Sequence, residues 1–121
     1  MRINWLGHAS FLLITEDITI ITDPFDPRVG YRLYEGPVDV ATVSHGHNDH
    51  NAVGFLKARP RVIDKPGSYE IKSAAIKGIS SFHDQKRGRE RGQNIIFKMV
   101  LDNIRIVHLG DLGHIPDKEQ V

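Results

Sequence analysis

The sequence contains no cysteine, and this absence limits the chemistry that the protein can use. Without cysteine the chain forms no disulfide bond, and a zinc site built on thiolates is excluded. Any bound metal must therefore be held by nitrogen and oxygen ligands. The absence of cysteine also agrees with a reducing compartment.

Long apolar runs and a strong charge bias are absent as well. No hydrophobic segment approaches the ~20 residues that span a bilayer, and the N-terminus lacks the pattern of a signal peptide. The net charge is only +1, which indicates neither a nucleic acid nor a membrane as partner. The 40% hydrophobic and 26% charged residues are typical of a globular protein. We therefore expect one soluble, cytoplasmic domain over residues 1–121.

Most of the chain is predicted to form β-strands. Residues 10–14 and 18–22 are rich in β-branched and aromatic side chains, and Glu16-Asp17 between them favours a hairpin turn. Residues 39–44 form a continuous apolar run, which is typical of a buried strand. Other strands are expected at 3–6, 61–64, 70–72, 74–77, 79–82, 94–101 and 104–109, with a loop at 84–93 and short helices at 49–57 and 117–121.

Three of the seven histidines fall within six residues, directly after the buried strand. The motif is His45-Gly46-His47-Asn48-Asp49-His50. If Asp49 begins a helix, His47 and His50 are three residues apart, a spacing that brings side chains onto a shared face. Imidazole and carboxylate ligands together suit zinc, iron, manganese or nickel. One such histidine alone would be a surface or capping residue, but four ligand-type residues at this spacing predict a metal site.

This motif resembles the signature of the metallo-β-lactamase superfamily, whose fold is an αββα sandwich that holds one or two metals. Other segments resemble, in order, the branch that includes the ascorbate-6-phosphate lactonase-like proteins. These segments are Leu6-Gly7-His8-Ala9-Ser10, Thr22-Asp23-Pro24, Ser81-Phe82-His83-Asp84, Arg91-Gly92-Gln93-Asn94 and the run from His108 to His114. The resemblance implies an α/β (α+β), strand-dominated sandwich, of which this chain would hold the N-terminal half to two-thirds.

The resemblance also implies a ligand set and a nucleophile. A first metal would be bound by His45, His47 and His83, and a second by Asp49 and His50, with Asp111 bridging both. A hydroxide between the metals would attack the substrate, because coordination lowers the pKa of water to about 7. Asp49 could also orient this nucleophile. Zinc is the expected metal, as one or two ions, with manganese and iron as alternatives.

Several of these residues have a competing structural interpretation. Asp111 alone would be an ordinary Gly-Asp turn, and His83 a packing histidine, but their register with the histidine motif favours ligands. His8 and His114 are candidate catalytic residues that could contact the substrate or support the metal ligands, and a structural role is an equal alternative for each. Asp23 could anchor a ligand histidine or only shape its turn.

Two further features are predicted to lie outside the ligand set. His108 alternates with isoleucines along its strand, which favours a buried, hydrogen-bonded histidine over a ligand. The basic loop at 86–91 carries Lys86, Arg87, Arg89 and Arg91. Its first interpretation is a solvated loop, and the alternative is a clamp for an anionic substrate, since arginine binds phosphate and carboxylate in bidentate fashion.

The resemblance is incomplete at the C-terminus. Nothing after His114 can supply the histidine of the Pro-x-His pattern that completes the second metal site in the family. We therefore expect an incomplete domain that forms a homo-oligomer or pairs with a complementing chain, because a half-sandwich exposes apolar surface.

The predicted function is that of a metal-dependent hydrolase acting on a small ester, lactone or phosphoester with anionic groups. The alternative is a non-catalytic metal-binding fragment or assembly module, which the missing histidine favours. A nuclease of the same superfamily is a third possibility, but the sequence shows no broad basic patch.

Overall fold

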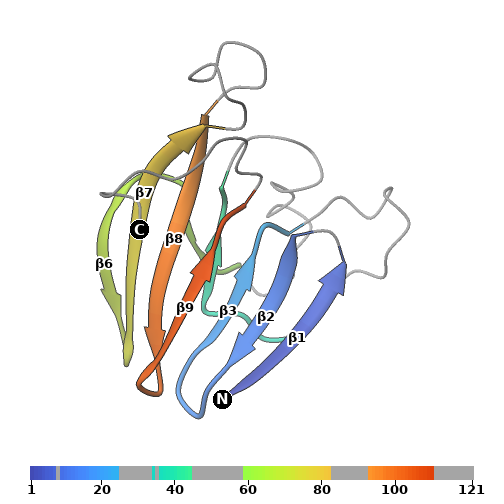
Figure 1. The fold of residues 1–121 in the computed structure, drawn as a ribbon. Coiled ribbons are helices and arrows are strands. Elements are labelled where there is room, and N and C mark those ends of the chain that lie inside the picture. The colour runs from blue at the N-terminus through green and yellow to red at the C-terminus, as the bar shows by residue number, and fades with distance from the viewer. Residues whose placement is uncertain (8, 25–33, 35, 45–58, 83–92, 111–121) are drawn as a thin grey trace.

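The computed structural model describes residues 1–7, 9–24, 34, 36–44, 59–82 and 93–110. Within these ranges the chain forms two β-sheets that pack face to face (Figure 1). No helix in the same ranges is long and apolar enough to cross a membrane. The predicted strand-dominated sandwich is therefore confirmed, whereas the helices expected at 49–57 and 117–121 lie outside the described residues.

The first sheet has five strands in the order β1-β2-β3-β4-β5. Their bounds are Arg2–Gly7 for β1, Ser10–Ile14 for β2, Thr19–Thr22 for β3, Val40–Thr42 for β4 and Arg61–Ile63 for β5. The strands β1 to β3 pair antiparallel, while β3, β4 and β5 run parallel. The predicted hairpin of β2 and β3 is confirmed, and the apolar run at 39–44 contains the fully buried β4.

The second sheet has four antiparallel strands in the order β6-β7-β8-β9. Their bounds are Gly67–Ile71 for β6, Ala74–Phe82 for β7, Gln93–Leu101 for β8 and Ile104–His108 for β9. Asp102 and Asn103 connect β8 to β9 with φ values of 51° and 61°. Positive φ at both positions is the requirement of a tight type I′ hairpin turn, which explains the polar pair found there.

The bounds of β6 and β7 were predicted wrongly. The strand β6 begins at Gly67, three residues before the predicted start. Residues 74–77 and 79–82 were expected as separate strands, but they form the single strand β7. Gly78 does not end the strand, because it pairs with Phe97 of β8. A Cβ atom at Gly78 would lie 3.2 Å from the Phe97 ring, so glycine at this position leaves room for a large core side chain.

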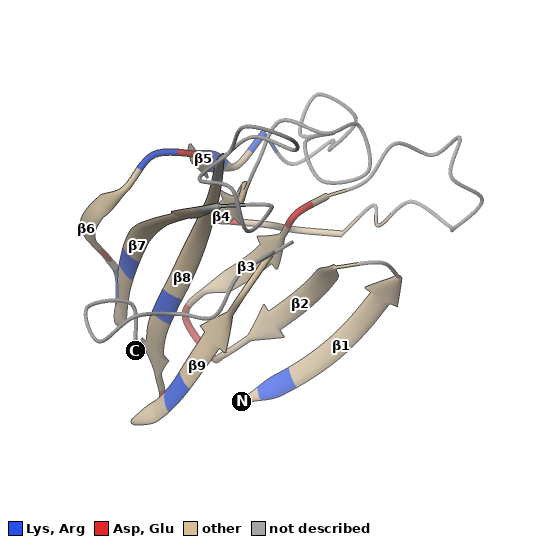
Figure 2. Ribbon diagram, turned by 45° about the horizontal axis from the view of Figure 1, so that its top comes forward, with Lys and Arg blue, Asp and Glu red and all other residues tan. Residues whose placement is uncertain are grey.

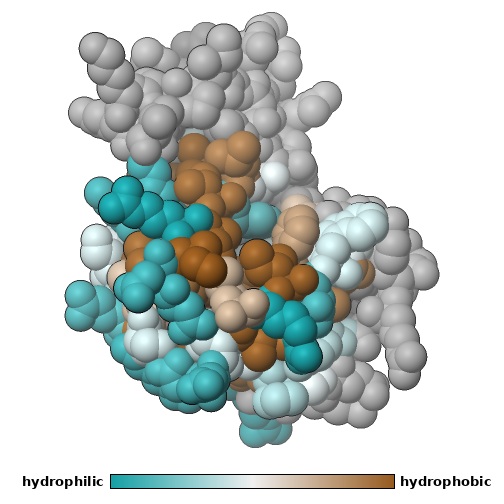
Figure 3. Space-filling view, turned by 60° about the horizontal axis from the view of Figure 1, so that its bottom comes forward, coloured by the Kyte–Doolittle hydropathy of each residue, from teal (hydrophilic) through white to brown (hydrophobic). Residues whose placement is uncertain are grey.

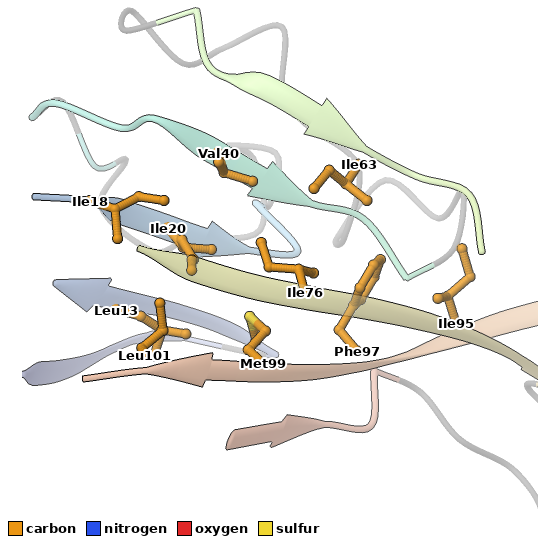
Figure 4. Packing of buried hydrophobic residues seen from close by; sticks show 11 residues of the cluster. Leu13, Ile18, Ile20, Val40, Ile63, Ile76, Ile95, Phe97, Met99 and Leu101 are labelled. Atoms are coloured by element: carbon orange, nitrogen blue, oxygen red, sulfur yellow. The ribbon is translucent and has the colours of Figure 1, made fainter. Parts of the chain in front are cut away.

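The core lies between the two sheets (Figure 4). Alternate side chains of β8, including Phe97 and Met99, face alternate side chains of the first sheet, such as Ile20 and Val40. All four are at most 1% exposed. Complete burial of one such side chain stabilises the folded state by about 1.5–3 kcal/mol. Residues two apart in β8, such as Phe97 and Met99, therefore point into the same core, as the period of a strand requires.

Six strands point the same way. The arrows of β1, β3, β7 and β9 end on one side of the sandwich in Figure 1, and β4 and β5 run parallel to β3. We call this side the carboxyl end. The opposite end holds Thr15 to Ile18, the turn at Lys72 and Ser73, and the turn at Asp102 and Asn103.

Candidate metal centre

The predicted site residues follow strands that finish at the carboxyl end. The candidate ligands and catalytic residues lie outside the described residues: His8, His45, His47, Asp49, His50, His83, Asp111 and His114. The structure does describe the residue immediately before four of them, namely Gly7, Ser44, Phe82 and Gly110. The arrangement of these preceding segments can be compared with what a metal site requires.

The segments that lead to His45 and to Asp111 are in contact. Gly110 has a φ of 61°, and a Cβ atom on it would lie 2.5 Å from both Cβ and Oγ of Ser44. Only glycine permits so close an approach with this backbone conformation. The Ser44 carbonyl also accepts a 2.9 Å hydrogen bond from the Ile95 backbone N–H of the other sheet. The two sheets are therefore joined at the residue before the histidine motif.

Asn94 ties the segment that leads to His83 into the same cluster. Its Nδ2 donates to the Ser81 Oγ at 3.0 Å and to the Leu109 carbonyl at 2.8 Å. Ser81 stands two residues before His83, and Asn94 is only 1% exposed. Three chain segments that precede predicted ligands, separated widely in sequence, thus meet in one cluster, formed by the buried Ser44, Asn94 and Ser81 and the half-buried Gly110.

Asp23 fixes the position of Ser44. This carboxylate is fully buried, and its Oδ1 and Oδ2 accept hydrogen bonds of 2.6 Å from the Ser44 backbone N–H and Oγ–H, respectively. The Asp23 N–H donates to the Thr42 carbonyl at 2.7 Å. Asp23 has a φ of 40°, a left-handed value that Asp tolerates better than most residues. Asp23 therefore both adopts a turn conformation and anchors Ser44, the residue that precedes His45.

His108 is largely buried and is hydrogen-bonded, close to what its place in the strand predicts. Its side chain is 11% exposed, and its Nε2 lies 2.8 Å from the Ala9 carbonyl. The other ring nitrogen, Nδ1, lies 3.9 Å from the Asp23 Oδ2. The Phe11 ring meets the imidazole in an edge-on arrangement, with ring centroids 6.1 Å apart. His108 thus lies between the Asp23 anchor and the loop that contains His8.

Buried polar atoms without a hydrogen-bond partner also gather at the carboxyl end. Among the described residues these atoms are Ser10 Oγ, Thr42 Oγ1 and His108 Nδ1. Each belongs to the first or last residue of its strand at that end. An unpaired buried polar atom costs about 1–3 kcal/mol, and native proteins keep such atoms chiefly where function requires them.

The described residues by themselves offer no group of three or more metal-binding side chains. The residues that follow the converging strand ends supply imidazole and carboxylate groups, and this donor set suits a divalent metal. The arrangement fits a metal site because ligands from distant parts of the sequence need a rigid common support.

The supporting residues Ser44, Asn94 and Gly110 were not predicted from the sequence. The sequence does contain a signal for these supporting residues. Each is a small or polar residue next to apolar strand residues, and each lies within one position of a strand boundary or of a predicted ligand. Polar residues at such positions are buried only when partners are present. Their partners come from other strands, however, so the sequence does not show them.

Comparison with known proteins agrees with this geometry. Residues 2–121 match the beta-lactamase superfamily domain. The chain belongs to the metallo-β-lactamase superfamily. A solved structure from Thermotoga maritima, assigned as a Zn-dependent hydrolase of this superfamily, is 42% identical with a TM-score of 0.76. The match covers 98% of this chain and 53% of that protein.

Curated relatives of this chain are also named as metal-dependent hydrolases. "UPF0173 metal-dependent hydrolase" of Methanosarcina mazei is 42% identical, and the match covers 100% of this chain and 65% of that protein. The protein of the same name from Desulforamulus reducens is 27% identical, with 100% and 66% covered. The chain thus spans slightly less than two thirds of the length of these two relatives.

Proposed function

We propose that this superfamily member works as a metal-dependent hydrolase that cleaves an ester, a lactone or a phosphoester in a small, anionic substrate. The observation that carries the proposal is the cluster of Ser44, Asn94, Ser81 and Gly110, which gathers the chain segments leading to His45, His83 and Asp111. The names of the relatives, which are metal-dependent or Zn-dependent hydrolases, support it.

We propose zinc as the metal, with manganese and iron as alternatives. The Zn-dependent assignment of the Thermotoga maritima relative supports this choice. The residues that would hold one or two ions are His45, His47, Asp49, His50, His83 and Asp111. When bound, such an ion lowers the pKa of a coordinated water to about 7 and polarises the scissile group.

The chain's own residues position the reaction. The Asp23 carboxylate and the Ser44 backbone hold the start of the histidine motif, and Asn94 holds the segments before His83 and Asp111. The Asp49 carboxylate is proposed to orient the attacking nucleophile. His8 and His114 are proposed to hydrogen-bond the substrate. The basic residues at 86–91 are proposed to bind its anionic group.

Metal-stripped and reconstituted protein tests the proposal. The full chain is treated with a chelator, reloaded with zinc, manganese or iron, and assayed for metal content and for turnover of generic carboxylic esters, lactones and phosphodiesters. We expect activity that requires metal and that falls more than about 100-fold in His47→Ala, beyond the 10- to 100-fold typical of outer-shell changes. Asp102→Asn, a change at the opposite end, serves as the control and should retain activity.

Tight metal binding without turnover of any of these substrates would overturn the proposal. That result would favour a non-catalytic metal-binding module with a role in assembly. Loss of turnover in His47→Ala with unchanged metal content and affinity would contradict the role of His47 as a ligand.

We also propose that the chain associates with a second chain. Large apolar side chains are exposed on the edge strands β1 and β9, namely Ile3, Trp5 and Val107 at 51%, 63% and 54%. Figure 3 shows apolar surface among hydrophilic groups on one face of the molecule. Sedimentation of the 121-residue chain tests this, and a stable 13.7 kDa monomer would contradict it.

A further inference from the structure

We propose that His108 is a positioning residue that holds the loop carrying His8 against the end of β9. This inference rests on the proposed function, because it assigns His108 to the support of a proposed substrate-binding residue. It concerns the Ala9 carbonyl, next to His8 in the chain, and the two side chains that approach this oxygen from different sheets.

The Ala9 carbonyl is held from both sides of the sandwich. His108 Nε2 of the second sheet lies 2.8 Å from this oxygen, and Thr22 Oγ1 of the first sheet donates to it at 3.0 Å. Thr22 Oγ1 in turn accepts a 2.9 Å hydrogen bond from the Phe11 N–H. The Ala9 oxygen, at the start of β2, is thus hydrogen-bonded to side chains from both β3 and β9.

The loop needs this support because it leaves the regular ladder between β1 and β2. The register shifts between Trp5 and Gly7, so that Gly7 pairs with Ser10, and Gly7 has a φ of 116°. A bulged connection of this kind lacks part of the ladder hydrogen bonding. The side chains of His108 and Thr22 replace it at Ala9.

The contact also determines the tautomer of His108. A carbonyl oxygen only accepts, so the hydrogen bond to Ala9 requires the proton on Nε2. Nδ1 then faces the Asp23 Oδ2 at 3.9 Å, beyond hydrogen-bond distance. A 180° turn of the imidazole about the Cβ–Cγ bond would put a carbon atom in the place of Nε2 and lose the Ala9 contact. His108 is thereby fixed between the anchor of the histidine motif and the His8 loop.

A purely structural histidine would affect only stability, whereas a positioning histidine affects the behaviour of His8. Two substitutions separate these roles. His108→Leu puts an apolar side chain of similar size in place of the imidazole and removes the hydrogen-bond donor. His108→Gln retains a side-chain N–H that reaches the place of Nε2. Arg105→Gln, at an exposed position of the same strand β9, is the matched control.

Two readouts are measured on the metal-loaded full chain. The first is kcat and KM with whichever generic ester or phosphodiester the wild type turns over. The second, which needs no activity, is the carbethoxylation rate of His8 with diethyl pyrocarbonate, followed by mass spectrometry.

In His108→Leu we expect kcat to fall by about 10- to 100-fold with metal content unchanged, as for outer-shell residues. We also expect the His8 modification rate to change at least threefold, a difference well above the scatter of such rates. His108→Gln should restore most of both, and Arg105→Gln should change neither.

The outcomes distinguish this inference from the proposed function. If the wild type shows no turnover but His8 reactivity changes in His108→Leu and recovers in His108→Gln, the hydrolase proposal fails and the positioning role stands. If wild-type turnover is present but His8 reactivity and kcat are unchanged in a folded His108→Leu, the positioning role is overturned. A variant that does not fold is replaced by Thr22→Val, which removes the second donor to Ala9, with Thr22→Ser as its rescue. Unchanged His8 reactivity in Thr22→Val would also overturn the role.

Discussion

Polar contacts join the two sheets at both ends of the sandwich, but they are buried at the carboxyl end and exposed at the opposite end. At the carboxyl end, Asp23 and Ser44 are at most 1% exposed. At the opposite end, the side chains of the Lys72–Asp39 ion pair are 50% and 38% exposed, and Asp102, which pairs with the N-terminus, is 43% exposed. Figure 2 also marks Lys or Arg positions along β7, β8 and β9 of the second sheet.

This difference shows where the fold requires exact geometry. A buried polar group must find its partner at the right distance, because water cannot replace the partner and the loss costs about 1–3 kcal/mol. An exposed pair contributes about 0–1 kcal/mol, since water competes with it. The strands that lead to predicted ligands are therefore held by contacts that tolerate little displacement. The turns at the other end are held by contacts that water can replace.

The largest effect is expected from Gly110→Ala. The new Cβ atom would lie 2.5 Å from Ser44 and Asn94, in a backbone conformation with a φ of 61°. Overlap and left-handed strain together should lower the free energy of unfolding by about 2–5 kcal/mol. Urea denaturation measures this loss. Because the change displaces the chain next to Asp111, metal affinity should fall as well.

Asn103→Ala is the matched control at the opposite end. Asn103 also has a φ of 61°, so this variant places alanine in the same conformation within an exposed turn. It should cost only the conformational part, about 1–2 kcal/mol. Equal losses for the two variants would show that the contact of Gly110 with Ser44 is unimportant.

The next largest effect is expected from Asp23→Asn, compared with Asp102→Asn. Both aspartates have positive φ values, 40° and 51°, which asparagine tolerates, but only Asp23 is buried. In Asp23→Asn the new amide N–H would face the Ser44 donors in place of one oxygen. This should lower the free energy of unfolding by about 2–4 kcal/mol. Asp102→Asn removes only an exposed ion pair and should cost less than about 1 kcal/mol.

If both variants lose the same stability in urea denaturation, burial would not explain the difference between the two ends. A further expected result is weaker metal binding in Asp23→Asn alone, measured by competition with a chromophoric chelator. Such selectivity follows from the position of Ser44 directly before His45.

The sequence allowed most of the strands to be predicted, but not the contacts between the strand ends that precede the predicted ligands. The β8–β9 hairpin follows from alternating apolar residues and Asp102-Asn103, which are local signals. The buried run 39–44 correctly placed a strand directly before the histidine motif. These features depend on neighbours in sequence, and the physics of local conformation determines them.

The supporting contacts depend on residues far apart in the chain. Asp23 and Ser44 are separated by 21 positions, and Asn94 and Leu109 by 15. Gly110 can be recognised as a close approach only when Ser44 is known to lie against it. Pairing of this kind is set by how the sheets stack, and stacking is a property of the whole core.

The pH dependence of stability should come partly from the opposite end. Hydrogen bonds from the Ser73 and Thr15 hydroxyls hold the pKa of Asp17 below its ordinary value. The Thr19 backbone N–H, which outweighs the opposing effect of burial, and the Lys72 ammonium lower the pKa of Asp39. Both carboxylates therefore stabilise the fold above the ordinary value of about 3.9. That stability is lost as the pH falls below this value through the lowered pKa values.

Asp17→Asn and Asp39→Asn should each flatten the acid side of the stability profile between about pH 5 and pH 2, measured by urea denaturation. At pH 7 each variant should be less stable than the wild type, and at the acid limit the two should approach it. A variant whose stability falls with acid as steeply as the wild type would show that its carboxylate does not contribute.

The smallest effect is expected from Lys72→Met. Lys72 Nζ lies 3.1 Å from the Asp39 Oδ1, and both side chains are substantially exposed. Loss of the pair should lower the free energy of unfolding by about 0–1 kcal/mol at low ionic strength. In 1 M NaCl, where the screening length is about 3 Å, the difference from the wild type should disappear. Gly110→Ala should lose the same stability at both salt concentrations, because its cost is steric. A salt-independent loss in Lys72→Met, as large as that of Gly110→Ala, would mean that the opposite end is held as rigidly as the end that leads to the predicted ligands.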